Sequence, residues 1–523
     1  MLIRLNEVFK SIPDDDDSEV LKEGIKENRN KIIDILYKAD VEDRIEILRN
    51  WDKAKGISIL ENKSINEQYK SEVKTIVEAK DFDEAERNVY KITRKQKDNK
   101  YTNHFRNFKY FFDEKLKYID STKLNQYAKV FLEKCQIIEI RSWQTEQAIT
   151  MFNSLNSTGM PLSDADIISA QLYSKAGEDK NKFNEQWERI NKLASELNTQ
   201  KVVNIDAILM QFMYINRANN REYVKYDSVD VTTPGMRRYY TDIKKELLNK
   251  PLELCDELQK IADKWQKVKD YPIVKLLLKL NENIKLFFSG YLYRYEIDEI
   301  TEEEILDVCE CLLRLFSLLE LLDVGYSSKN FKTFLFGANV KLVDKNISIQ
   351  EIKQDFNKHI CKNWNEKGIK DSILDYDKNI LVFLNEYLYS KSKNYKFDFT
   401  ENTNIEHIMP ASGRDIETIQ QDAGITDKAE FNNLVNKLGN KILLEENINK
   451  SIGREWFKTK KQTKISDKSG YKDSQYAIAK DLTDYHKDKW EKGDIEKALD
   501  KASARIGTFI FQNETMKSAE CHN

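Results

Sequence analysis

The chain has 523 residues, enough for about three domains of ordinary size, and this length excludes a small disulfide scaffold. Hydrophobic residues make up 40% and charged residues 33%, and there are only 16 glycines and 6 prolines, which excludes both a disordered chain and a many-turned sandwich. Its 85 basic and 88 acidic residues give a net charge of -3, which neither requires nor excludes a nucleic-acid partner. We therefore expect a mainly helical protein.

The N-terminal region, residues 1–183, has apolar residues three and four apart, as in Ile32, Ile33 and Leu36, which predicts amphipathic helices. The acidic run Asp14 to Asp17 lies beside a proline and is interpreted as a solvated loop without function. The chain start lacks an apolar signal segment, and no stretch is long enough for a membrane span. We expect a cytoplasmic protein without a membrane partner.

A glycine turn follows within Phe152 to Asp166. The sequence predicts a helix, an extended Met-Pro after Gly159, and a new helix capped by Ser163 with Asp166 three residues on. The middle region, 184–395, is also expected to be helical, including a buried helix at 305–324 and a loop at 229–235. Polar residues at 390–404 indicate a junction before a last domain, 396–515, which ends in a tail, 516–523.

Chemistry-bearing residues gather at the start of this last domain. Glu406 and His407 occupy a short apolar-alternating strand that ends at Pro410, so their side chains point to opposite faces. About thirty residues later, 438–450 reads as a glycine turn, a second strand and a helix start with asparagines, which completes a ββα unit. In such a unit a strand histidine activates water while a carboxylate and a helix amide hold one divalent cation, Mg²⁺ or Mn²⁺, on the scissile phosphate.

The spacing of these residues resembles the HNH, or His-Me finger, nuclease motif, with EHIMP as the first strand. The resemblance implies that His407 is the general base, that Glu406 and Asn449 are metal ligands with Asn447 as the alternative, and that Asn440 orients the histidine. Glutamate stands here where many such motifs have aspartate.

A longer stretch, 406–510, is similar to the nuclease domain of GmrSD-type restriction proteins (domain-of-unknown-function family 1524), through Phe457, Lys461, Tyr476, Trp490, Ile495 and Arg505. Upstream, FNSLNSTGMPLSDADIISAQLY resembles the signature of the ParB-like partner domain of the same proteins (family 262). The resemblance implies that Asn156, Thr158 and Gly159 lie near a nucleotide-binding core.

The partner domain's DGQQR motif for nucleotide hydrolysis is absent from this sequence. The expectation is therefore a truncated partner domain at 1–183 that binds no NTP by itself. A truncated gene, a late start codon or a core on a separate subunit would each account for this absence, and in the last case the partner would be a nucleotide-hydrolysing subunit that carries the missing core.

A basic stretch interrupted by aromatic residues follows the second strand. It predicts contacts with the nucleic-acid backbone, the alternative being a solvated lysine face. The candidate residues are Lys450, Arg454, Lys458, Lys460, Lys461 and Lys464.

These observations predict mainly helical N-terminal and middle regions followed by a C-terminal ββα-metal nuclease domain. The function they favour is a metal-dependent HNH-type endonuclease that hydrolyses DNA in restriction defence against phage or other foreign or modified DNA. Two alternatives stay open: a non-catalytic regulatory or interaction subunit of a restriction complex, and an RNA-directed nuclease.

Overall fold

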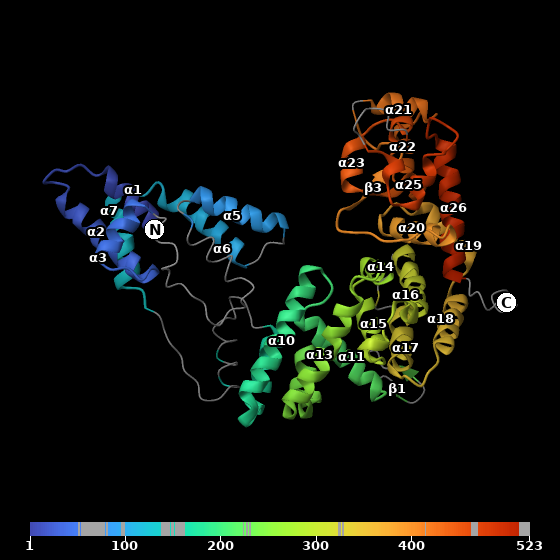
Figure 1. Ribbon diagram of the computed structural model, residues 1–523, viewed down its shortest axis with the longest axis horizontal. Helices are drawn as coiled ribbons and strands as arrows, with labels where there is room; N and C mark the ends of the chain where they lie inside the picture. The colour runs from blue at the N-terminus through green and yellow to red at the C-terminus, as the bar shows by residue number, and fades with distance from the viewer. Residues whose placement is uncertain are drawn as a thin grey trace. The chain divides into compact units, whose positions relative to one another are not determined.

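The computed structural model describes residues 1–523 apart from 51–52, 54–78, 80–81, 96–99, 137–146, 148–150, 152–162, 223, 226–227, 230–231, 323–325, 327–328, 414, 462–468 and 512–523. The chain forms two compact units, Met1–Trp143 and Gln144–Asn523. The described residues are mainly helical, as the sequence predicts (Figure 1). Of the helices described, none combines the length and the apolar character needed to cross a membrane.

The described part of the first unit consists mainly of helices. They are α1 (Leu2–Ser11), α2 (Glu19–Leu36), α3 (Val41–Arg49), α5 (Phe82–Lys95), α6 (Lys100–Phe111), the π-helix η3 (Phe112–Leu116) and α7 (Ser121–Glu133). Helices α1, α2 and α7 pack around the fully buried Leu5, Ile25 and Leu124. The loop Asp14 to Asp17 between α1 and α2 is exposed, as predicted.

The second unit begins with a helical bundle. Its α-helices are α9 (Asp164–Lys175), α10 (Lys180–Thr199), α11 (Ile205–Asn219), α12 (Met236–Arg238), α13 (Pro251–Val268), α14 (Pro272–Leu280), α15 (Ile284–Tyr293), α16 (Glu302–Leu322), α17 (Phe334–Val343), α18 (Ile349–Asn363), α19 (Glu366–Asp375) and α20 (Ile380–Ser392). Short 3-10 and π turns join them: η4 (Gly177–Asp179), η5 (Tyr239–Ile243), η6 (Lys245–Asn249), η7 (Ile297–Glu299) and η8 (Lys329–Thr333).

Helix α9 confirms the predicted N-terminal cap. The Ser163 side chain accepts from the Asp166 backbone N–H at 3.1 Å, and the Asp166 carboxylate accepts from the Ser163 N–H at 3.1 Å, which is a reciprocal capping box. The turn residues Asn156, Thr158 and Gly159 lie outside the described residues.

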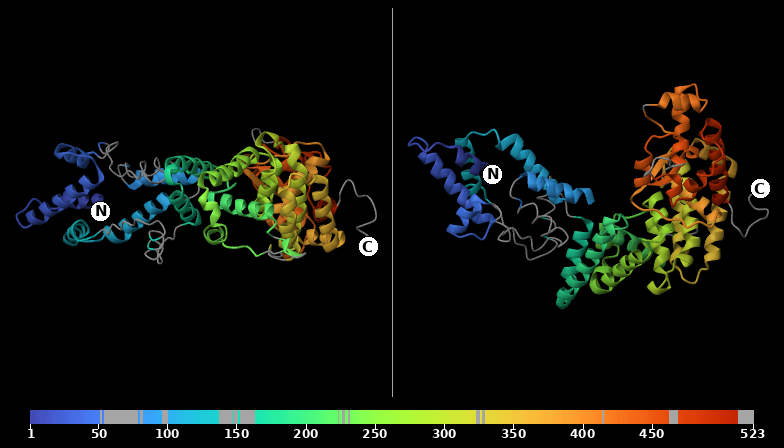
Figure 2. Two further views of the ribbon diagram at one scale, coloured as in Figure 1. Left: turned by 90° about the horizontal axis from the view of Figure 1, so that it is seen from below. Right: turned by 45° about the horizontal axis from the view of Figure 1, so that its top comes forward.

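The predicted buried helix is α16. Its side chains from Ile305 to Leu319 are mostly inside, and Arg314 is buried among them. The Arg314 guanidinium donates to the Ile510 carbonyl at 2.8 Å and to the Asn357 side chain, so that it joins α16 to α18 and to the last helix. Both views of Figure 2 show the C-terminal elements, in orange to red, beside the yellow part of the bundle, to which α16 and α18 belong.

The C-terminal elements surround a two-stranded sheet. They are β3 (Thr403–His407), α21 (Ile416–Asp422), α22 (Lys428–Val435), η9 (Leu438–Asn440), β4 (Lys441–Glu445), α23 (Glu446–Ile452), α24 (Phe457–Lys461), η10 (Tyr471–Asp473), α25 (Ala477–Leu482) and α26 (Lys492–Phe511). Strands β3 and β4 pair antiparallel, and α23 follows β4 directly, so the predicted order of strand, strand and helix is present. A second small hairpin, β1 (Val224–Lys225) with β2 (Ser228–Val229), ends where the loop predicted at 229–235 begins, and the described residues 232–235 form neither helix nor strand.

Gly439, in the turn before β4, lies against the backbone of α26. A Cβ atom at this position would be 2.2 Å from the Ile495 carbonyl oxygen and 2.6 Å from the Leu499 nitrogen. Since backbone atoms of a packed helix cannot move aside easily, only glycine fits, and α26 is held close to the turn that leads into β4.

We predict that Gly439→Ala destabilises the second unit, because the new methyl group overlaps the α26 backbone. Overpacking of this kind costs at least about 1–3 kcal/mol. The measurement is chemical denaturation followed by tryptophan fluorescence, with Gly493→Ala as the control, because a Cβ at Gly493 meets nothing within 4 Å. Equal stability of the two variants would contradict the close approach.

Candidate active site

The register of β3 and β4 fixes the direction of the predicted catalytic residues. His407 pairs with Lys441 and Glu406 pairs with Ile442. Because neighbouring residues of a strand point to opposite faces, His407 shares one face with Lys441, while Glu406 lies on the other face. In the paired strands, the Glu406 and His407 side chains therefore lie on opposite faces of the sheet, as the sequence predicts.

His407 is half-buried at the end of β3, and its Nε2 atom is buried without a hydrogen-bond partner among the described residues. Burial lowers the pKa of the imidazole, and the nearby ammonium groups of Lys441 and Lys460 lower it further, whereas the Asn436 side chain acts in the opposite direction. The ring is therefore held in its neutral form, which is the form that can accept a proton.

Asn440 is fully buried and binds the chain just after the histidine. Its Oδ1 accepts from the Met409 N–H at 2.8 Å, and its Nδ2 donates to the Met409 carbonyl at 2.9 Å and to the Val435 carbonyl at 3.0 Å. Its own carbonyl accepts from the Ile408 N–H at 2.9 Å. Asn440 thus holds the segment that follows His407. The hydrogen bonds of its side-chain amide go to backbone groups of Met409 and Val435.

Glu406 is buried beneath the opposite face of the sheet and is 5% exposed. Its Oε1 accepts from the Lys460 ammonium and from the Tyr471 hydroxyl, the latter at 3.2 Å. Burial raises the pKa of the Glu406 carboxyl, an effect that the neighbouring positive charge of Lys460 opposes. The carboxylate is therefore a buried group with a fixed cationic partner.

The other predicted metal ligands lie on α23, where Asn447 is exposed and Asn449 is half-buried. No hydrogen bond joins either amide to Glu406 or His407, all four of which the structure describes. The donor types fit a hard divalent cation, because Mg²⁺ prefers carboxylate and amide oxygens. An ion at Glu406 would share this carboxylate with the Lys460 ammonium. Over the described part of the chain, no group of three or more His, Cys, Asp or Glu residues is placed to hold a metal.

The predicted basic surface divides into exposed and buried members. Lys450, Arg454 and Lys458 are exposed, and Lys458 forms an ion pair with Asp488 at 2.6 Å. Lys460 and Lys461 are buried, so the structure corrects their assignment to a phosphate-binding surface. The Lys461 ammonium donates to the Tyr485 carbonyl at 2.6 Å, inside the domain. Lys464 lies outside the described residues.

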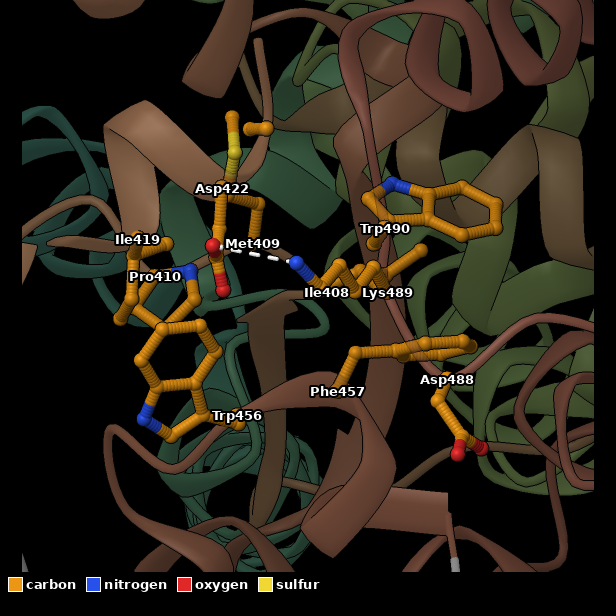
Figure 3. A pocket seen from close by; sticks show the side chains of 11 residues that line it. Ile408, Met409, Pro410, Ile419, Asp422, Trp456, Phe457, Asp488, Lys489 and Trp490 are labelled. Carbon is orange, nitrogen blue, oxygen red and sulfur yellow. Dashed lines mark ion pairs between the residues drawn. The ribbon is translucent and has the colours of Figure 1, made fainter.

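A small pocket adjoins the end of β3 (Figure 3). Its lining includes Ile408, Met409 and Pro410, the rings of Trp456 and Trp490, and the Asp422–Lys489 ion pair at 3.1 Å. Its volume of about 20 Å³ is room for roughly one water molecule. The pocket therefore adjoins the segment after His407, and it is too small for a nucleobase.

The segment from Ser474 to α25 is tied to β3, β4 and α20 by side-chain bonds. The Ser474 hydroxyl donates to Glu445 Oε2 at 2.8 Å, and the Gln475 N–H donates to Glu445 Oε1 at 2.7 Å. From α20, the buried Glu386 accepts from the Ala477 N–H at 2.6 Å and so caps α25. Burial raises the pKa of Glu386 to about 7, although the hydrogen bonds from the α25 backbone act to lower it.

Sequence reasoning did not identify Lys441, Tyr471 or Glu386 as part of this arrangement. The strand pattern does place Lys441 opposite His407, since a short second strand must begin near residue 441. Tyr471 and Glu386 lie 65 and 20 residues from Glu406, and no periodicity connects them to it.

Comparison with known families gives two matches. Residues 347–501 match the family described as "GmrSD restriction endonucleases, C-terminal domain". Residues 8–173 match "GmrSD restriction endonuclease, N-terminal domain", and the two matches together cover more than half of the chain. No curated protein and no solved structure matches it.

We predict that Glu386 makes the second unit less stable as the pH rises from about 4.5 to about 7. In this window the unfolded chain releases the carboxyl proton while the folded protein retains it, so the free energy of unfolding falls with pH. The whole effect amounts to roughly 3 kcal/mol, from 1.36 kcal/mol per pKa unit. Glu386→Gln removes this titration, so its stability relative to the wild type should rise across the window in urea denaturation. A stability difference that does not change with pH would refute the assignment.

Proposed function

Because the chain belongs to the GmrSD restriction endonuclease family, we propose that it is a metal-dependent HNH-type endonuclease in which His407 is the general base. Membership of this family, inferred from the sequence motifs, is confirmed, and it makes the protein an endonuclease with a restriction role. The C-terminal match includes β3, β4 and α23 and so contains every residue of the candidate site.

The observation that carries the proposal is the order of strand, strand and helix that places His407 at the end of β3, beside the segment bound by Asn440. A neutral imidazole has one nitrogen that can take a proton from water, and burial lowers the pKa of His407 toward this form. The deprotonated water attacks the phosphorus atom and the bond to the leaving oxygen breaks. The Asn440 side chain binds Met409 and so holds the chain just after the histidine in place.

We assign Glu406 and Asn449 as the residues that would hold the metal ion, with Asn447 as the alternative to Asn449. When bound, the divalent cation stabilises negative charge on the phosphate in the transition state. Helix α23 directly follows β4 and packs against β3, which supports this set because it brings the asparagines to the strand that carries Glu406.

We further propose DNA as the substrate and defence against foreign DNA as the role, since the family is one of restriction endonucleases. Lys450, Arg454 and Lys458 are the described basic candidates that remain exposed for the phosphate backbone. Contacts to phosphates position a duplex without reading its sequence, so these residues would set affinity rather than site choice.

We predict that His407→Ala lowers the rate of DNA cleavage by about 10²–10⁴-fold, the usual contribution of a general base. The variant should still fold, because the ring is half-buried and contributes little core area. His486→Ala is the matched control, since His486 is exposed in the same part of the chain. Cleavage of duplex DNA on gels and thermal unfolding check both points. A His407→Ala protein that cuts at the wild-type rate would exclude His407 as the base.

We predict that removing divalent cations with EDTA abolishes cleavage and that added Mg²⁺ or Mn²⁺ restores it, because the transition-state charge needs a cation. The same gel assay checks this, with labelled RNA as a parallel substrate. Full activity in excess EDTA would refute metal dependence, and exclusive cleavage of RNA would refute the DNA assignment.

A further inference from the structure

Lys460 is the most deeply buried charged side chain of α24, with 1% of its side chain exposed. Its ammonium donates to Glu406 Oε1, to the His407 carbonyl at 2.8 Å and to the Ile408 carbonyl at 3.2 Å. A lysine ammonium has three hydrogens to donate. All three are therefore used on three consecutive residues at the end of β3.

The bonds from Lys460 complement those from Asn440. Lys460 holds the carbonyl groups of His407 and Ile408, while Asn440 holds the N–H groups of Ile408 and Met409 and the Met409 carbonyl. Two buried side chains from distant parts of the sequence thus bind the backbone from His407 to Met409. The position of His407 is therefore fixed through hydrogen bonds to the backbone at and just after this residue.

Burying the Lys460 ammonium is costly unless acceptors surround it. An ammonium group without partners inside a protein is strongly unfavourable, and an ion pair of this kind often gains less than an apolar replacement would. A carboxylate and two carbonyl oxygens surround the Lys460 ammonium, so each of its three hydrogens has an acceptor.

The three lysines of α24 have different surroundings, which separates their roles. The Lys458 side chain is 58% exposed and pairs with Asp488, and Lys461 binds the carbonyls of Tyr485 and Lys487. Of these three, Lys460 alone contacts the strand that carries Glu406 and His407. A phosphate group cannot reach its ammonium without unpacking the domain.

We propose that Lys460 is a positioning residue, which clamps the end of β3 and thereby sets the placement of His407 and Glu406 for the reaction. The reaction itself rests on the proposed function above. Lys460 acts through Glu406 and the backbone at His407 and Ile408, and it does not touch the substrate.

The test compares Lys460→Met with Lys458→Met in DNA cleavage. Loss of the clamp should lower kcat of Lys460→Met by about 10²-fold, since a misplacement near 1 Å costs this much, with KM for DNA within about twofold of the wild type. Lys458→Met removes an exposed candidate phosphate contact, so it should raise KM for DNA instead of lowering kcat. Wild-type kcat in folded Lys460→Met, or a raised KM with unchanged kcat, overturns the proposal, and the second result would make Lys460 a phosphate contact.

Hydrogen exchange provides a second readout that does not depend on activity. In Lys460→Met, amides of the peptide covering residues 405–410 should exchange at least tenfold faster than in the wild type, while Lys458→Met should leave them unchanged. Unchanged exchange in Lys460→Met overturns the clamp. If the wild type does not cut DNA, the proposed function fails, and this measurement still decides the clamp.

If Lys460→Met does not fold, Lys460→Arg replaces it in both measurements. The arginine retains a buried cation for Glu406, but its planar donors cannot match the same three acceptors. We expect kcat at least tenfold lower in the folded protein. A wild-type kcat and wild-type exchange in Lys460→Arg overturn the proposal.

Discussion

The antiparallel pairing of β3 with β4 is the constraint on which the candidate site depends. Two strands by themselves are at best marginally stable in water. Here β4 packs on α20 and α25, and the turn before it fits against α26 through Gly439. The sheet is therefore held by helices that lie before and after it in the chain, and the placement of His407 follows from the packing of the whole C-terminal part.

Charged groups inside this part of the protein act as structural ties. Lys441, Lys460 and Lys461 are buried, and each ammonium donates to backbone carbonyl groups of another segment. Burial lowers the pKa of Lys460 and of Lys441. The gain from these bonds is directional, because each lysine fixes one loop or strand end at one place, which apolar packing alone does not do.

Local patterns in the sequence were sufficient for several elements. The cap Ser163 with Asp166 and the strand carrying Glu406 and His407 depend on residues close together in the chain, and both are present. The inward direction of Lys460 could not be predicted in this way. Successive residues of a helix differ by about 100° in direction, so a cluster of lysines does not reveal which one faces the core. The helix α24 must first be placed against β3 to decide it.

The bonds of Arg314 bear on how this polypeptide can be divided for expression. The guanidinium in α16 is bound to the Ile510 carbonyl near the end of α26, and α26 also packs on α18, α19 and α20. A fragment that begins after α20 would contain the strands and asparagines of the site, yet the apolar side of α26 would face water. Constant exposure of such a surface favours aggregation. A recombinant nuclease fragment should therefore start upstream of α16.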